Sequence, residues 1–331
     1  MLRSQTEYMS LDAVQTDVFH ELLQSGQTVR PRHFSTVEIT AASFTLLDPR
    51  NRCIYNTARK WSLPLALGEL SWHLSGSRIA EEIAYYAPAW SSFADMTGRI
   101  SGSCYGSKIF GSRSPDESSQ WSRAKGLLRT DQDTRRAMLI FADSQTQFDP
   151  ACLDAACATS LQFLIRRGKL DAVVCMRSND AVWGLPYDVF LFTFLQEVMA
   201  LELGVDLGSY HHFAASLHLY ERHIGLAQRA LAAPPPNRAA PMPPIVQLED
   251  LSKFLTIERA IREGATVPTA SGLAQYWRDL VKVLKLYRLS KALGWEAAIA
   301  SASSPGPYLA LLLPLMESGS AAESTALDAA S

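Results

Sequence analysis

The segment between Tyr187 and Leu203 limits the fold most strongly, because apolar side chains cover nearly every face of the helix it would form. A helix on the surface of a globular protein carries a polar stripe along its exposed side, and this segment lacks one. We therefore expect a long helix that is deeply buried in the core.

The patterns around this segment predict a mixture of strands and helices. Apolar runs rich in β-branched and aromatic residues predict strands at 36–47, 137–142, 169–177 and 210–220. Apolar residues at helical spacing predict helices at 11–24, 63–74, 151–166, 248–264 and 271–301. Residues 86–112 are expected to form a structured loop with short helices, and residues 1–10 to be unstructured.

A Pro- and Ala-rich segment from Ala232 to Pro244 interrupts these patterns and predicts an extended connector. The helical stretch 245–318 follows, and we expect it to pack on the part of the chain before the connector. The Ser- and Ala-rich residues 319–331 are expected to be disordered.

Composition narrows the class of protein. The 331 residues are 47% hydrophobic, which is enough for a sizeable core, and the net charge of −2 argues against a general nucleic-acid binder. Five cysteines form no disulfide framework and no pair with zinc-ligand spacing, so we expect a reducing, cytoplasmic location and no metal. The apolar run Leu309–Met316 is too short to span a bilayer, and we see no signal peptide.

Polar residues are concentrated among the apolar segments of 157–223, where they must be paired or functional. For any one of them, a satisfied polar group in the core would be the better interpretation. Their order and spacing carry more information than their types. They are Cys157, Gln162, Arg177, Ser178, Asn179, Asp180, Asp188, His218 and Tyr220.

These residues resemble the motifs of the thymidylate synthase family. The runs Arg-Ser-Asn-Asp at 177–180, Gly-Leu-Pro-Tyr-Asp at 184–188 and His-Leu-Tyr at 218–220 follow the family's order and spacing. Cys157 stands five residues before a Gln-Phe pair, as the family's nucleophile does, with Gly-Lys-Leu at 168–170 beyond it. Upstream, Glu69-Leu-x-Trp72, Trp90, Tyr105-Gly106 and the paired arginines Arg135 and Arg136 also match.

The resemblance covers roughly residues 10–244 and implies an α+β fold, with a mixed β-sheet packed against helices. It implies a catalytic domain over 1–244, to which 245–318 would be an extra helical segment. Family members end in a short apolar tail that closes over the folate, and nothing similar follows residue 244. Ala158 and Ser216 also depart from the family, which usually has His and Asp there. These departures argue against methyl transfer, since hydride transfer needs a tightly closed, dry site.

Asp188 is the most informative departure, because thymidylate synthases place Asn there to recognise the uracil edge. An amide offers one donor and one acceptor, which match the N3–H and O4 of uracil. Cytosine instead presents an N3 acceptor and an amino donor. A protonated carboxyl group matches that edge, and a carboxylate matches an N3-protonated cytosine. Asp188 therefore resembles the residue of the cytidylate hydroxymethylases within the family.

The resemblance also implies a mechanism and the roles of the site residues. The Cys157 thiolate would add to C6 of the pyrimidine, with Arg177 helping to activate it, and C5 would then take the one-carbon unit of 5,10-methylenetetrahydrofolate. Water attack on the resulting methylene, with Glu69 ordering the water, would give a hydroxymethyl group. Trp90, Asp180 and Tyr105 would face the folate.

Phosphate and sugar contacts follow from the same resemblance. Arg177 and Ser178 would hold the phosphate, together with Arg30 or Arg32, while Arg135 and Arg136 would arrive from the second subunit of a homodimer. His218 and Tyr220, two apart on a strand, would bind the 3′-hydroxyl of the sugar. Asn179 is a weaker nucleotide-binding candidate.

The sequence leaves the sugar of the substrate and two alternative functions open. Ribose and deoxyribose are not distinguished, although we favour CMP and, with it, a host that makes a modified nucleoside antibiotic. The first alternative is a methyl-transferring synthase acting on dUMP or a cytidylate, which would produce dihydrofolate. The second is an inactive family member that serves as a binding protein.

Overall fold

The computed structural model describes residues 6–111, 118–236, 240–302 and 306–316. Its centre is an eight-stranded mixed sheet with the main order β1-β3-β8-β6-β5-β4, to which β2 adds on β3 and β7 on β8. The strands are β1 (Thr6–Tyr8), β2 (Gln27–Val29), β3 (Thr36–Leu46), β4 (Met138–Ile140), β5 (Ala158–Arg166), β6 (Lys169–Met176), β7 (Asn179–Asp180) and β8 (Asp206–Tyr220). β1 runs parallel to β3, and β6 and β7 run parallel to β8; the other pairs are antiparallel.

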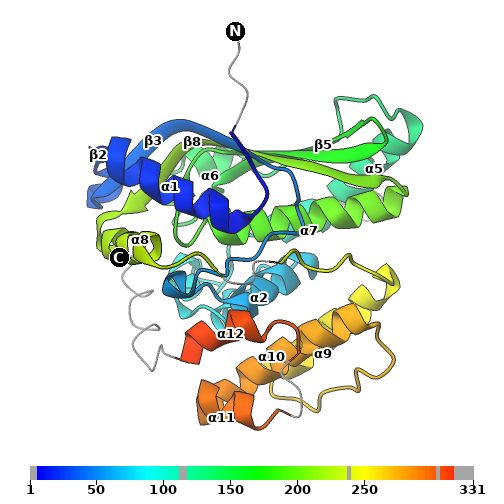
Figure 1. Cartoon of the computed structure of the whole chain (residues 1–331). Coiled ribbons are helices and arrows are strands. Elements are labelled where there is room, and N and C mark those ends of the chain that lie inside the picture. The colour runs from blue at the N-terminus through cyan, green and yellow to red at the C-terminus, as the bar shows by residue number, and fades with distance from the viewer. Residues whose placement is uncertain (1–5, 112–117, 237–239, 303–305, 317–331) are drawn as a thin grey trace.

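The expected central helix is α7 (Leu185–Leu203), and it lies along one face of this sheet (Figure 1). Its side chains are buried from Leu185 to Ala200 with few interruptions, which confirms the burial predicted from the sequence. Gln196, one of its few polar residues, donates from Nε2 to the carbonyl oxygens of Leu170 (2.9 Å) and Ser209 (3.1 Å). The helix thereby satisfies carbonyl groups next to an irregularity in the β6–β8 register.

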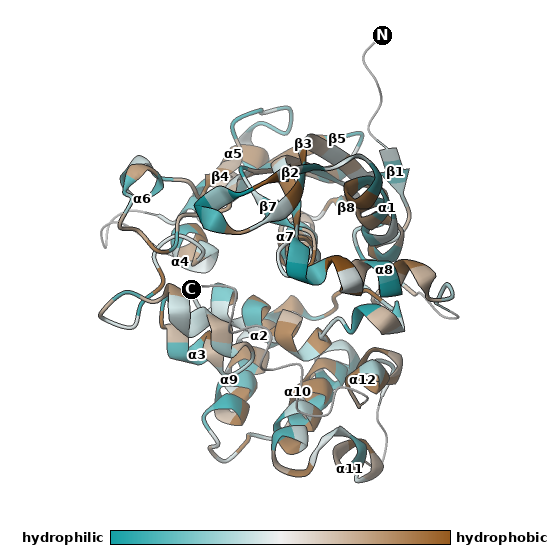
Figure 2. Cartoon of the chain, turned by 90° about the vertical axis from the view of Figure 1, so that its left-hand side faces the viewer, coloured by the Kyte–Doolittle hydropathy of each residue, from teal (hydrophilic) through white to brown (hydrophobic). Residues whose placement is uncertain are grey.

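Helices α1, α2 and α5 pack against α7, and the C-terminal helices lie farther from the sheet. Helix α2 lies between α7 and the C-terminal helices, as Figures 1 and 2 show. The helices are α1 (Leu11–Ser25), α2 (Leu63–Leu74), α3 (Ala80–Ala84), α4 (Tyr105–Phe110), α5 (Gln120–Thr130), α6 (Ser144–Phe148), α8 (Ile224–Ala232), α9 (Leu251–Arg262), α10 (Gln275–Leu293), α11 (Trp295–Ala300) and α12 (Leu309–Met316). Within the described ranges, no helix has the length and apolar character that a membrane span requires.

The helix predicted at 151–166 is wrong. Residues Ala158–Arg166 form β5, and the buried residues Leu161, Phe163 and Ile165 alternate with less buried ones, the period of a strand. The chain then turns into β6 through Arg167 and Gly168, which have φ values of 53° and 73°. Two successive positive φ angles are typical of a two-residue hairpin turn.

Two other predictions also needed correction. Residues Thr6–Tyr8, expected to be unstructured, pair with Phe44–Leu46 as a short edge strand. The helix expected over 271–301 divides into α10 and α11 at Gly294, whose φ of 80° is incompatible with a continuing helix. The tail expected at 319–331 lies outside the described residues.

A buried ion pair joins α7 to the segment after β3 and to the C-terminal part. The Arg52 guanidinium donates to Glu197, and both side chains are at most 1% exposed. Arg50 Nε (2.7 Å) and the Ile245 backbone N–H (3.0 Å) donate to the other carboxylate oxygen. Burial alone would raise the pKa of Glu197, but the two arginines and this N–H lower it instead. Glu197 is therefore ionised, and both of its carboxylate oxygens accept hydrogen bonds.

Replacing this carboxylate tests how much the junction contributes to stability. Glu197→Gln removes the charge that compensates buried Arg52, and we expect the free energy of unfolding to fall by about 3–5 kcal/mol. The ion pair of the exposed Lys253 with Asp250 supplies the control, because Asp250 keeps its hydrogen bond from the Ala274 N–H and Lys253→Ala should cost less than about 1 kcal/mol. Urea unfolding at neutral pH measures both. Equal effects of the two substitutions would contradict this assignment.

Candidate active site

The sheet brings the central residues of the site together at the start of β5. Cys157 directly precedes β5, and Arg177 directly follows the antiparallel neighbour β6, so the two lie side by side. The backbone N–H of Arg177 donates to the backbone carbonyl of Cys157 (2.8 Å). Asp188 comes to the same place from the first turn of α7. Three separate elements thus position the nucleophile, a cation and a carboxyl group.

Arg177 is held rigidly against the nucleophile. Its Nε donates to the carbonyl of Ala156 (2.8 Å) and its Nη2 to that of Ala155 (2.9 Å), which leaves Nη2 3.9 Å from Cys157 Sγ. Burial raises the pKa of the Cys157 thiol to about 11, while the charges of Arg177 and Arg32 oppose that rise. The thiol is therefore protonated in this state, and the two arginines favour its conversion to the thiolate.

The loop before the nucleophile is fastened by a carboxylate that sequence analysis missed. Asp154 accepts hydrogen bonds from the N–H groups of Gly102 (2.7 Å) and Ser103 (2.8 Å) and from the Ser103 hydroxyl (2.5 Å). A Cβ at position 102 would lie 2.1 Å from the Asp154 carbonyl oxygen, so only glycine allows this approach. The pattern around Cys157 gave no signal for Asp154 beyond its acidic type.

Tyr105 contacts the backbone next to Cys157. Its hydroxyl accepts from the Ala158 N–H (3.1 Å), and its ring stacks on His73 with centroids 5.4 Å apart. Burial lowers the pKa of His73 to about 3, so its ring is neutral and Nδ1 can accept from the Gly106 N–H (3.2 Å). A buried, neutral support thus fixes Tyr105.

Two carboxyl groups with raised pKa values, those of Glu69 and Asp188, face the same part of the site. Trp90, on a 3₁₀ helix at Pro88–Phe93, donates from Nε1 to Glu69 Oε1 (3.2 Å). Burial, followed by the charge of Asp188, raises the pKa of Glu69 to about 8. Burial also raises the pKa of Asp188 to about 7, against a lowering hydrogen bond from the Asn179 amide (2.8 Å). Groups with pKa values near neutrality are suited to proton transfer.

The candidate sugar-binding residues lie beside this centre. The His218 and Tyr220 rings are 5.3 Å apart and nearly perpendicular. Burial raises the pKa of Tyr220, and the charges of Asp180 and Cys157 add to the rise while Arg32 opposes it. Of the two arginines left open by the sequence, Arg32 is therefore the one whose charge acts on both Tyr220 and Cys157. Both arginine side chains are exposed to solvent, Arg30 directly after β2 and Arg32 in the 3₁₀ helix Pro31–His33 that follows.

The turn before α7 contains the remaining motif residues. The Asp180 carboxylate accepts from the N–H groups of Val182 (2.8 Å) and Trp183 (3.3 Å), which fixes the turn between β7 and α7. Ser178 lies partly buried in the link between β6 and β7. Both are next to the centre, as the motif order predicts.

Arg135 and Arg136 are the candidates that a single chain does not bring to the centre. Both are exposed just before β4, where the Arg135 carbonyl accepts from Gln162 Nε2 (2.7 Å). Gln162 lies five residues along β5 from Cys157, a separation of roughly 16 Å. Within one chain, the two guanidinium groups thus lie at the edge of the sheet.

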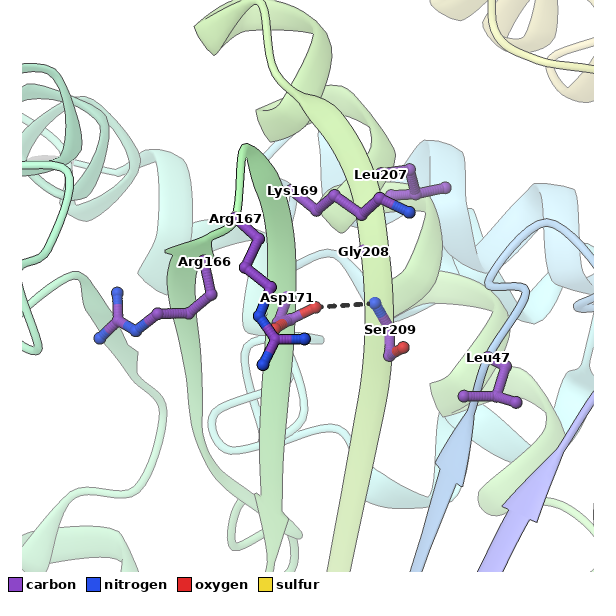
Figure 3. A pocket seen from close by; sticks show the side chains of 8 residues that line it. All are labelled: Leu47, Arg166, Arg167, Lys169, Asp171, Leu207, Gly208 and Ser209. Carbon is purple, nitrogen blue, oxygen red and sulfur yellow. Dashed lines mark hydrogen bonds between the residues drawn. The ribbon is translucent and has the colours of Figure 1, made fainter.

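A separate cavity of about 580 Å³ lies at the other end of the sheet (Figure 3). Arg166, Arg167 and Lys169 line it around the β5–β6 turn, and Asp171 accepts from the Ser209 N–H there (2.8 Å). The full length of β5, roughly 30 Å, separates this cavity from Cys157. We therefore assign the chemistry to the cluster around Cys157.

The sequence pattern that describes thymidylate synthase matches residues 15–257. The chain belongs to the thymidylate synthase family. This confirms both the resemblance and the expected α+β fold. Helices α10 to α12 lie beyond the matched residues. Family enzymes use methylenetetrahydrofolate as co-substrate and act on pyrimidine nucleotides. Among the described residues, no group of three metal-ligating side chains is found.

Several relatives carry names of hydroxymethyltransferases. Deoxycytidylate 5-hydroxymethyltransferase of Enterobacteria phage T4 is 28% identical over 232 residues, covering 67% of this chain and 90% of the phage protein. Deoxyuridylate hydroxymethyltransferase of Delftia phage PhiW-14 is 29% identical over 209 residues, covering 60% of this chain and 57% of its own. The enzyme of that name from Bacillus phage SP01 is 28% identical over 213 residues, covering 62% and 55%. These names support a folate-dependent one-carbon transferase and divide over the base.

The contact between Arg177 and Cys157 can be tested without substrate. Arg177→Gln removes the charge that lowers the pKa of the thiol, so the thiolate fraction at a given pH should fall. We expect alkylation of Cys157 by iodoacetamide at pH 8 to slow about tenfold. Mass spectrometry would follow each cysteine separately, with the partly exposed Cys152 as the internal control. Unchanged labelling of Cys157 would contradict the activating role of Arg177.

Proposed function

We propose that this protein is a cytidylate 5-hydroxymethyltransferase that converts CMP or dCMP, 5,10-methylenetetrahydrofolate and water to the 5-hydroxymethylcytidylate and tetrahydrofolate. The observation that carries the proposal is Asp188. It stands at the base-recognising position of the family motif, and burial raises its pKa to about 7. A carboxyl group with that pKa can hold a proton in neutral solution.

The protonation of Asp188 matters because cytosine and the side chain must share one proton. If the carboxyl group carries it, the O–H donates to N3 and the other oxygen accepts from the amino group. If N3 carries it, the carboxylate accepts both hydrogen bonds. Uracil, whose N3–H and O4 need one acceptor and one donor, would require the proton in a different place. The base preference therefore depends on the charge and orientation of one side chain.

The proposed covalent step uses Cys157. Its sulfur forms a bond to C6 of the pyrimidine, and the electron pair of the C5–C6 double bond moves toward C5. C5 then bonds to the methylene carbon of the co-substrate and afterwards loses its proton, while tetrahydrofolate departs. Arg177 favours the thiolate at the beginning of this sequence and again when the C6–S bond breaks.

Glu69 would direct the final step. Water adds its oxygen to the exocyclic methylene and gives up a proton, and expulsion of Cys157 restores the aromatic ring. Glu69 has a pKa of about 8, lies within electrostatic range of Asp188 and is oriented by Trp90. A carboxyl group with this acidity can order the water and exchange protons with it near neutral pH.

The residues around this centre fit a folate. Methylenetetrahydrofolate supplies the one-carbon unit when it is bound. Trp90 is partly exposed beside Glu69, and Tyr105 contacts the backbone next to Cys157. Asp180 would face the pterin ring from the turn before α7. These three residues would form the folate side of the site.

The phosphate and sugar contacts complete the proposal. Arg177, Ser178 and Arg32 would hold the phosphate, and His218 with Tyr220 would hold the 3′-hydroxyl. Arg135 and Arg136 would reach the phosphate of the other subunit in a homodimer. A row of exposed and half-buried residues across the sheet supports this assembly, since Ile140, Ser160, Cys175 and Phe213 are successive register partners. Ile140 is 52% and Phe213 37% exposed, as expected of an interface between two copies.

A product assay tests the reaction. Purified protein would be mixed with methylenetetrahydrofolate and, separately, CMP, dCMP, UMP and dUMP, while product mass and dihydrofolate absorbance are followed. We expect a hydroxymethyl product on a cytidylate without dihydrofolate, and this would also identify the sugar. A methyl product with dihydrofolate, or a product on uridylates alone, would contradict the proposal.

Asp188→Asn tests the recognition of the base. The amide matches uracil, so the ratio of kcat/KM for cytidylates over uridylates should fall by roughly a hundredfold or more. Cys157→Ser serves as the control that abolishes turnover of every nucleotide. An unchanged ratio in competition assays would remove Asp188 from base recognition.

The same proton predicts the pH dependence. Above pH 7 the free enzyme loses the proton of Asp188, so kcat/KM for the preferred cytidylate should fall about tenfold per pH unit relative to that of the Asp188→Asn variant on uridylates, which retains the titration of Cys157. In the Asp188→Asn variant this limb should be absent from the profile with uridylates, because the amide does not titrate. A limb near pH 7 that persists in the variant would belong to another group.

A further inference from the structure

We propose that His212 is a positioning residue for base specificity: together with Tyr210 it orients the Asn179 amide, which in turn fixes one oxygen of Asp188 as a hydrogen-bond acceptor. The inference rests on the proposed role of Asp188 and extends it to buried residues of β7 and β8. Its basis is a continuous buried chain of four side chains from β8, β7 and α7.

The chain has three links of ordinary hydrogen-bond length. Tyr210 Oη lies 2.9 Å from His212 Nδ1, His212 Nε2 lies 3.1 Å from Asn179 Oδ1, and Asn179 Nδ2 lies 2.8 Å from Asp188 Oδ2. Tyr210, His212 and Asn179 are at most 2% exposed. At its other end, Asp188 is partly accessible from the site. Three buried side chains are therefore connected by hydrogen bonds to Asp188, which is proposed to contact the base.

The chemistry of the side chains gives the chain a direction. Burial lowers the pKa of His212 to about 3 and raises that of Tyr210 well above its usual value, so the ring is neutral and the phenol keeps its proton. Because the Asn179 carbonyl oxygen can only accept, the one ring proton of His212 lies on Nε2, and Nδ1 accepts from the Tyr210 hydroxyl. Nε2–H then donates to the Asn179 carbonyl oxygen. The amide nitrogen of Asn179 is left to donate to Asp188.

This direction selects one arrangement of Asp188. Since Oδ2 accepts from Asn179, the proton of the acid form is favoured on Oδ1. A cytosine edge needs that division, with one oxygen donating to N3 and the other accepting from the amino group. If the Asn179 amide were reversed, its oxygen would face Asp188 and would favour a proton on Oδ2 instead. His212 and Tyr210 oppose this reversal, because a reversed amide requires the ring proton on Nδ1, and the buried Tyr210 O–H would then lose His212 as its acceptor.

The packing around the chain leaves the amide little other freedom. The His212 ring stacks on Phe44 with centroids 4.9 Å apart and an angle of 14°. On the other side, a Cβ at position 184 would lie 2.9 Å from Asn179 Nδ2, so glycine is needed where the turn passes the amide. Rotation of the amide plane by half a turn, which exchanges its oxygen and nitrogen, is the movement that packing alone would still permit.

Other titratable groups act on Asp188 from the elements packed around it. The charge of Asp180 on β7 raises its pKa, and Asp188 interacts in turn with groups on α2, before β5, on α4 and on β8. Those groups are Glu69, Cys157, Tyr105 and Tyr210. A shift in a pH profile is therefore assigned to the chain only when it depends on Asp188 itself.

The test compares His212→Phe with His212→Gln. Phe keeps the ring that stacks on Phe44 but cannot donate to Asn179, whereas Gln retains an amide donor. We expect His212→Phe to lower the cytidylate-over-uridylate ratio of kcat/KM about tenfold, and His212→Gln to restore part of it. The loss of an oriented donor should also move the basic limb on cytidylates to higher pH. Tyr210→Phe removes one hydroxyl and should give a smaller change in the same direction.

A double-mutant cycle separates this role from simple packing. In the Asp188→Asn background, His212→Phe should no longer change the base ratio, because the group it positions has been replaced. Circular dichroism and the thermal midpoint would show that each variant is folded. If His212→Phe lowers the rates on both bases equally and leaves the pH limb in place, the inference is overturned while the proposed function stands. A wild-type enzyme without preference for cytidylates would overturn both before any variant is made.

Discussion

The burial of α7 is the constraint on which the rest of the structure depends. A helix without a polar side must be covered by the sheet on one face and by helices on the others, and this requirement sets the layers of the fold. Its few polar residues are each used inside the core. Gln196 satisfies strand carbonyls, and Glu197 forms the ion pair with Arg52. The body of α7 is therefore fixed before any ligand binds.

Because the body of α7 is fixed, its first turn, which contains Asp188, is fixed as well. Asp188 in the first turn of α7 and Glu69 on α2 approach each other from two rigid elements, with little water to screen them. Burial, and after it the charge of Asp188, raises the pKa of Glu69 to about 8, and burial raises that of Asp188 to about 7. The same packing that stabilises the fold thus produces two carboxyl groups that can exchange protons near neutral pH.

Much of this could be predicted from the sequence, because apolar periodicity and motif order are local signals. The long helix, the strand at 210–220 and the meeting of Cys157, Arg177 and Asp188 follow from them. β5 was mistaken for a helix because its apolar density concealed the alternation of Leu161, Phe163 and Ile165. The buried chain through His212 depends on contacts between β8, β7 and α7. One sequence signal could have suggested it: Tyr210, His212, His218 and Tyr220 are an even number of positions apart on one strand, so their side chains lie on the same face of the sheet.

The C-terminal helices contact the wall of the site rather than its centre. Glu258 on α9 accepts from the Tyr86 hydroxyl (2.8 Å), and Tyr287 on α10 stacks on the Tyr86 ring at 5.4 Å. The Tyr86 ring packs directly against α2 at Gly68. Glycine is needed there, because a Cβ would lie 2.3 Å from the ring. Glu69 is the next residue. Helix α10, which lies beyond the family match, thus backs the turn of α2 that carries the carboxyl group proposed to order water.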